Sequence, residues 1–147
     1  MLSPSLRKAA LCAASAALLA LPFAASAAGS DTKAVLGFDM SFGAKITPEV
    51  FGGLLHASEN SAGHYNGVKA LAYWDFTRGF TPSKVKLMGI LDGRRSWQPE
   101  LGVGYNINAA SPFFSAGLSS QHLTGGVDFN PQAGLAPYAG VQIPPRP

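Results

Sequence analysis

Cysteine and charged residues are both scarce in this sequence, and each scarcity excludes a class of function. The single cysteine, Cys12, lies in the apolar stretch near the amino terminus. The rest of the chain therefore offers no thiol nucleophile, no disulfide and no cysteine ligand for zinc. Charged residues make up 13% of the chain, about half the share in ordinary soluble domains. Acidic and basic residues nearly balance once Arg7 and Lys8 are set aside, which excludes the basic surface that nucleic-acid binding requires.

Long hydrophobic runs are missing as well, except at the amino terminus. Two basic residues precede an uncharged run rich in Ala and Leu over residues 9–23, and a small-residue stretch follows at 25–27. This order is typical of a secretory signal peptide, and the run is shorter than the roughly 20 residues of a membrane-spanning helix. The sequence therefore predicts a cleaved signal peptide over residues 1–27 and a single domain over residues 28–147. Any membrane insertion of that domain would have to use strands.

Glycine, aromatic and β-branched residues dominate the predicted domain, and turn residues recur at short intervals. Short strands at such spacing are typical of an all-β sandwich or barrel. Tight turns are indicated by the Asn, Pro and Gly residues of segments 60–63 and 130–134. A longer loop is expected at 77–83. The predicted strands are 33–44, 49–59, 65–76, 84–92, 98–108, 112–120, 122–130 and 134–143.

Four of these strands alternate cleanly between two kinds of side chain. In the fifth, Leu101, Val103 and Tyr105 alternate with Gly102 and Gly104. A soluble sandwich would carry many charges on its outward face, whereas here the second face carries mostly Gly, Ser, Thr and Asn. Small residues fit the crowded interior of a narrow barrel, and the apolar face suits lipid. The sequence therefore predicts an all-β fold, an antiparallel up-and-down β-barrel of about eight strands. A soluble periplasmic β-sandwich that acts as a binding protein is the alternative.

The glycine-punctuated strand segments at 102–106, 123–129 and 137–141 resemble those of small porin-like barrels of bacterial outer membranes. The resemblance is one of strand style over residues 33–143, without a diagnostic motif. It implies a Gram-negative outer-membrane protein with a structural or porin-like role and no enzymatic activity. Such proteins typically end on an aromatic residue, whereas this chain departs from the pattern with the Pro-rich segment 143–147.

One group of residues suggests catalysis. His56 and Ser58 stand two residues apart on a predicted strand, so both point to one face, and the hydroxyl is within reach of the imidazole. Some outer-membrane barrels that hydrolyse lipid use a similar His-x-Ser pair. The orienting acid would have to come from elsewhere, with Asp39 and Asp75 as candidates. An outer-membrane lipid hydrolase is therefore the alternative function, and a polar strand end that leads into a loop is the simpler interpretation.

Lipid is the expected partner of the domain. Arg94 and Arg95 lie in a predicted loop, and guanidinium groups suit the phosphate oxygens of lipopolysaccharide. The chain has no phosphate-binding glycine loop and no metal-ligand spacing, so neither a cofactor nor a metal is predicted.

Charged residues on the predicted interior face are expected to pair across the barrel. Asp39, Glu100 and Asp128 would face Lys45 and Lys69 there. An eight-stranded barrel is only wide enough for side chains to fill it, so a wide solute channel is not expected.

Overall fold

The computed structural model describes residues 32–59, 61–94 and 96–143. The predicted signal peptide, Arg95 and residues 144–147 lie outside these ranges. No helix within them is long and apolar enough to cross a membrane. The strands are β1 (Thr32–Phe42), β2 (Ile46–Glu59), β3 (Tyr65–Asp75), β4 (Thr81–Gly93), β5 (Gln98–Asn106), β6 (Ser111–Ser119), β7 (Leu123–Asn130) and β8 (Gly134–Ile143).

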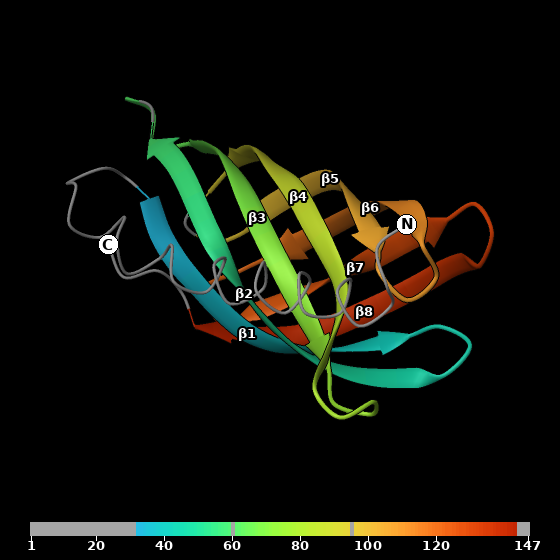
Figure 1. Cartoon of the computed structure of the whole chain (residues 1–147). Helices are drawn as coiled ribbons and strands as arrows, with labels where there is room; N and C mark the ends of the chain where they lie inside the picture. Colours follow the sequence, from blue (N-terminus) through green and yellow to red (C-terminus); the bar gives the residue numbers. More distant parts are fainter. Residues whose placement is uncertain (1–31, 60, 95, 144–147) are drawn as a thin grey trace, which may run out of the picture.

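The eight strands form one closed sheet in chain order (Figure 1). Each strand pairs antiparallel with the next, and β1 closes the sheet on β8, where Asp39 lies opposite Gly140. The predicted antiparallel up-and-down barrel is confirmed. The sandwich architecture of the alternative is wrong, because the strands of the described residues form a single sheet that closes on itself. Closure also pairs both edges that an open sheet would leave unpaired.

The strand boundaries differ from the prediction by at most three residues, and the largest differences are the earlier starts of β2 and β4. The expected loop at 77–83 is shorter, since β4 begins at Thr81. Gly79 and Phe80 both have positive φ, 73° and 58°, and this left-handed pair reverses the chain within a tight turn. Pro82 is accommodated where the β3–β4 pairing shifts register, between the partners of Tyr73 and Trp74. Such an irregularity tolerates a residue that cannot donate a ladder hydrogen bond.

Side chains alternate between the barrel lumen and its outer surface. In β5, Glu100 is 4% exposed, whereas the neighbouring Leu101 is 54% exposed. In β4, Lys84 and Lys86 are buried, and Leu87 is exposed. The period-two pattern of the sequence thus becomes an inside and an outside, as the pleat of a strand requires. The alternation therefore creates two surfaces that bear on function, the outer wall and the lumen.

Candidate functional site

The outer surface of the barrel is apolar. Large hydrophobic side chains on the strands point away from the lumen and are exposed. They are Leu36, Phe38, Phe42, Ile46, Val68, Val85, Leu87, Leu91, Leu101, Val103, Tyr105, Phe114, Leu118, Leu123, Phe129, Leu135, Val141 and Ile143. Exposed apolar patches on soluble monomers rarely exceed a few hundred Å², so a surface of this kind marks contact with a partner or with lipid.

The strands bury their charges instead. Among the strand residues whose burial is described, eight charged side chains are less than one-tenth exposed, namely Asp39, Glu49, Lys69, Asp75, Lys84, Lys86, Glu100 and Asp128. In soluble proteins such side chains are almost never fully buried unless they are paired. The lumen must therefore supply partners for them.

Aromatic side chains gather at one end of the barrel. This end, called the loop end here, is where β1 turns into β2, and the terminal end is where β1 begins and β8 finishes. Phe42, Tyr105 and Phe129 occupy the last or next-to-last strand positions at the loop end. The Phe80 ring stacks on Trp74 there, with centroids 6.2 Å apart. A ring of aromatics at a strand end is typical of the level where a membrane meets water.

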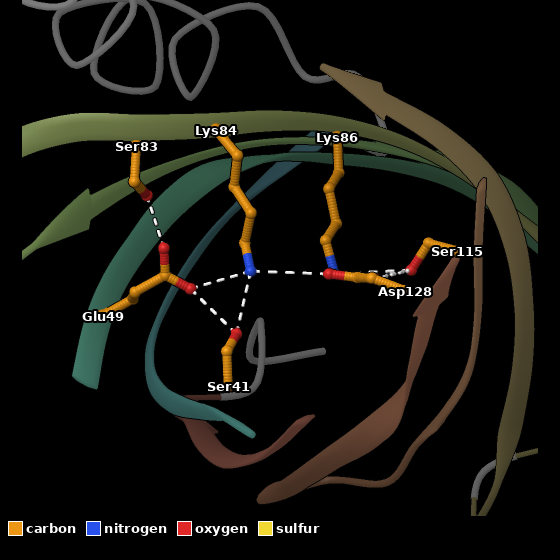
Figure 2. Close-up of polar contacts among 7 residues, drawn as sticks. All are labelled: Ser41, Glu49, Ser83, Lys84, Lys86, Ser115 and Asp128. Carbon is orange, nitrogen blue, oxygen red and sulfur yellow. Dashed lines mark hydrogen bonds and ion pairs between the residues drawn. The ribbon is translucent and has the colours of Figure 1, made fainter. Parts of the chain in front are cut away.

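Lys84, on β4, connects its own strand to three others inside the lumen (Figure 2). Its Nζ lies 2.7 Å from Oε2 of Glu49 on β2 and 3.4 Å from Oδ2 of Asp128 on β7, and donates to Ser41 Oγ of β1 at 3.0 Å. Ser83 donates to the other carboxylate oxygen of Glu49 at 2.5 Å. Both oxygens of Glu49 are thus bound, which compensates for the loss of water around them.

Lys86 forms the second centre of the same network (Figure 2). Its Nζ lies 2.7 Å from Asp128 Oδ1. Ser115 donates to that same oxygen at 2.6 Å. The ammonium also sits 3.8 Å from the centroid of the Tyr138 ring, a cation–π contact. The network therefore ties β4 to β6, β7 and β8 through the lumen.

A separate ion pair lies nearer the terminal end. Lys69 Nζ of β3 is 2.5 Å from Glu100 Oε1 of β5, and Ser119 of β6 donates to that same oxygen. The predicted pairing of Lys69 with an interior carboxylate is confirmed. The prediction for Lys45 is wrong, because this residue lies exposed in the β1–β2 turn rather than in the lumen.

Sequence reasoning missed the central partners of the network. Lys84 and Lys86 bind Asp128, and Glu49 binds Lys84, yet none of the three had been assigned to the interior. A usable signal was present, since Lys84 and Lys86 alternate with the apolar Val85 and Leu87. Two lysines at period two share one face of a strand.

Asp39 stands apart from these pairs. Its side chain is 0% exposed, and neither carboxylate oxygen has a hydrogen-bond partner in the described structure. It lies opposite Glu49 in the β1–β2 register. Asp39 is within electrostatic reach of Lys84, Glu49, Lys86 and Asp128, so the lumen holds three carboxylates and two ammonium groups close together.

The lumen on the β1–β4 side also holds a cluster of packed apolar side chains. Its members are Val35, Phe51, Leu55, Leu71, Tyr73 and Ile90. Phe51 and Tyr73 pack with ring centroids 5.2 Å apart. Side chains and ion pairs together occupy the interior, as expected for a barrel of eight strands.

The structure places His56 and Ser58 on the outer surface near the terminal end, where both are exposed. His56 Nδ1 lies 3.0 Å from Oγ1 of Thr32, its partner in the β1–β2 register. Neither suggested acid reaches this site. Asp39 is inside the lumen. Asp75 lies opposite Glu49 in the β2–β3 register, and Glu49 is about 23 Å from His56 along β2 at roughly 3.3 Å per residue. The catalytic role of His56 and Ser58 stays a prediction.

Arg94 is exposed in the β4–β5 turn at the terminal end. Its backbone N–H donates to the carbonyl oxygen of Trp97 at 2.8 Å, which holds the turn closed. Arg95, the second predicted phosphate ligand, lies outside the described residues. Within the described ranges, no group of three or more His, Cys, Asp or Glu side chains is arranged to hold a metal ion.

Comparison with protein-family models, curated proteins and solved structures gives no match for this chain.

Proposed function

We propose that this protein is an integral β-barrel of a bacterial outer membrane and that its role is structural. The observation that supports this most directly is the inverted distribution of side chains, with apolar residues outside and charged residues in the lumen. A barrel in water gains stability by burying apolar surface, at about 25 cal/mol per Å², and this barrel leaves much of that surface outside. In lipid the same surface is matched to its surroundings.

Backbone pairing and strand length support the same proposal. A membrane barrel needs every strand paired, because lipid offers no hydrogen bonds to a free edge. The sheet is closed, and β1, β5 and β8 have 11, 9 and 10 residues. Tilted strands of about 9–11 residues cross the hydrocarbon core.

A structural role is favoured over a porin-like one by the contents of the lumen. Lys84 and Lys86 reach across it to carboxylates on other strands, and packed apolar side chains fill the space beside them. Open porins have 16 or more strands and a water-filled interior. We therefore propose that no stable solute channel exists.

The proposed orientation follows from the even number of strands. β1 begins and β8 finishes at the same end of the barrel, so Thr32 and Ile143 lie on one side of the membrane. A chain exported by a signal peptide reaches the outer membrane from the periplasm, and the terminal end then faces the periplasm. Arg94 would accordingly meet phospholipid phosphates of the inner leaflet, and lipopolysaccharide of the outer leaflet would meet the loop end.

Membrane fractionation of the full-length protein, expressed in a Gram-negative bacterium, tests the proposal. We expect recovery in the outer membrane and faster gel migration of unboiled than of boiled samples, because a closed barrel resists detergent until heated. Recovery as a soluble periplasmic protein would overturn the membrane assignment.

Val103→Arg tests the apolar surface directly. Val103 lies in the middle of β5, 50% exposed and opposite Phe114. A charge at this depth costs about 2–4 kcal/mol in a membrane barrel, whereas Leu135→Arg near a strand end costs about 1 kcal/mol or less. In vesicles we expect Val103→Arg to lower the folded fraction and Leu135→Arg to leave it nearly unchanged. Equal tolerance of both changes would contradict a lipid-facing wall.

A further inference from the structure

An apolar groove of about 570 Å³ runs along the outer wall over β6 and β7. Its sides are formed by the outward residues Leu118, Leu123 and Val127, and Trp97 closes it at the terminal end. The outward positions between them are small, Ala116 on β6 and Gly125 on β7, which makes the wall concave there. The volume lies within the range of small-molecule sites, roughly 300–1,000 Å³.

The groove follows the strands for a length that accommodates most of one acyl chain in a leaflet. It follows the β6–β7 pair from Leu118, opposite Gly125, to Ala116, opposite Val127. From Leu123 to Val127 the strand advances about 13 Å at roughly 3.3 Å per residue. Half of a hydrocarbon core of about 30 Å is about 15 Å deep. Because the strands tilt by about 45°, a chain seated in the groove would span about 9 Å of that depth, more than half of one leaflet.

A cationic residue, Arg94, belongs to the turn that carries Trp97 at the terminal end of the groove. The turn hydrogen bond from Arg94 to Trp97 fixes the backbone of Arg94 beside the residue that closes the groove. The Arg94 side chain is exposed there. Guanidinium groups suit phosphate oxygens, and Trp is favoured at the interface between headgroups and acyl chains. From the terminal end inwards, this wall carries a cationic residue, then Trp97, then the apolar groove. An anionic phospholipid likewise carries a phosphate at its headgroup and an acyl chain beyond it.

We propose that this groove is a binding site for an anionic phospholipid, with one acyl chain along β6–β7 and its phosphate at Arg94. The site rests on the proposed membrane location, since it is filled from the surrounding leaflet. A second copy of the chain fits the groove less well. A stable protein interface buries about 1,200–2,000 Å², far more than one acyl chain covers, and requires partner contacts well beyond the groove.

Quenching of Trp97 fluorescence tests the proposal. In the Trp74→Phe variant, Trp97 is the remaining tryptophan of the chain. The folded variant is placed in phosphatidylcholine vesicles that contain a minor fraction of brominated lipid, either phosphatidylglycerol or phosphatidylcholine. One cationic side chain at a membrane surface attracts an anionic lipid about fivefold. We expect brominated phosphatidylglycerol to occupy the site about fivefold more than the zwitterionic lipid at equal fraction.

Two variants separate the phosphate contact from the groove. Arg94→Gln should abolish the preference for phosphatidylglycerol, and Arg78→Gln, in the turn at the opposite end, should retain it. Gly125→Leu should fill the groove and reduce quenching by either lipid. A Cβ at Gly125 meets nothing nearer than Tyr138 O at 3.4 Å, an ordinary contact distance, so the backbone has room for a side chain that points into the groove. Gly89→Leu is the matched control, because Gly89 is a glycine on the distant β4 whose added Cβ meets Leu101 O at 3.5 Å.

A reporter on another wall distinguishes failure of this site from failure of the membrane assignment. With both native tryptophans replaced by Phe, Leu87→Trp places the fluorophore on the exposed outer face of β4. Quenching at position 87 without any lipid preference at Trp97 would overturn the binding site and leave the membrane barrel intact. Quenching at position 87 with Trp97 shielded from both lipids would assign the groove to a second copy and also overturn the proposal. No quenching at either position would overturn the membrane assignment itself.

Discussion

Lys86 and Asp128 meet across the lumen with 2.7 Å between Nζ and Oδ1, although they come from β4 and β7, which are not neighbours in the sheet. The Lys86 side chain is 1% exposed and that of Asp128 is 9% exposed. A contact of this kind connects opposite walls, whereas ladder hydrogen bonds connect only adjacent strands. The lumen network therefore stabilises the closed form of the barrel in a way that strand pairing alone does not.

Breaking this pair should destabilise the barrel. Lys86→Met leaves Asp128 with Ser115 and the longer contact to Lys84, and we expect a loss of about 3 kcal/mol in the free energy of unfolding. Urea unfolding in detergent or vesicles, followed by gel migration, measures this. The double variant Lys86→Met/Asp128→Leu should recover part of the loss, because both buried charges are gone. Lys45→Met, in an exposed turn, serves as the control and should change stability by less than about 0.5 kcal/mol.

Asp39 should respond differently from the other carboxylates of the network. Its oxygens have no hydrogen-bond partner in the described structure, so Asp39→Asn removes no hydrogen bond and relieves a buried charge. We expect its free energy of unfolding to equal or exceed that of the parent. Glu49→Gln, by contrast, weakens the pair with Lys84 at 2.7 Å and should cost about 3 kcal/mol. If both variants lose the same stability, Asp39 has a partner equivalent to that of Glu49.

Strand packing should depend on particular glycines. A Cβ at Gly53 would lie 1.9 Å from the backbone oxygen of Ala70 on β3, and backbone cannot move aside cheaply. Gly53→Ala should therefore destabilise the barrel by about 1–3 kcal/mol. Gly89→Ala places its Cβ at ordinary contact distance, 3.5 Å from Leu101 O, and should be tolerated. The comparison of their unfolding midpoints checks the strand register, and equal midpoints would contradict it.

Ser58→Ala addresses the hydrolase alternative. The two candidate acids lie in the lumen or about 23 Å away, and the His56 ring is hydrogen-bonded to Thr32. We therefore expect cells that express the parent, the Ser58→Ala variant or no protein to contain the same membrane lipids. Mass spectrometry of lipid extracts from cells that express the parent, Ser58→Ala or no protein measures this. A deacylated lipid present with the parent and absent with Ser58→Ala would favour the hydrolase, with Thr32→Val as the next variant to examine.

The sequence by itself determined the strands and their two faces. Alternation such as that of Leu101 and Val103 with Gly102 depends on the pleat, a local property that repeats every two residues. The apolar face, the scarcity of charge and the recurrent turn residues were enough to predict eight strands and a closed barrel. The early start of β4 escaped prediction, because the left-handed conformation of Phe80 is unusual for a bulky side chain.

Only the tertiary structure decided which interior charges meet. Lys69 and Glu100 were expected in the lumen, but Lys84, Lys86 and Glu49 had not been placed there, and Lys45 was placed there wrongly. Distances across a lumen depend on closure and on the stagger between strands, which the period of a single strand does not encode. The same holds for the groove over β6 and β7. Its small residues are visible in the sequence, but their alignment beside Trp97 and Arg94 arises from the pairing of neighbouring strands and the turn that precedes β5.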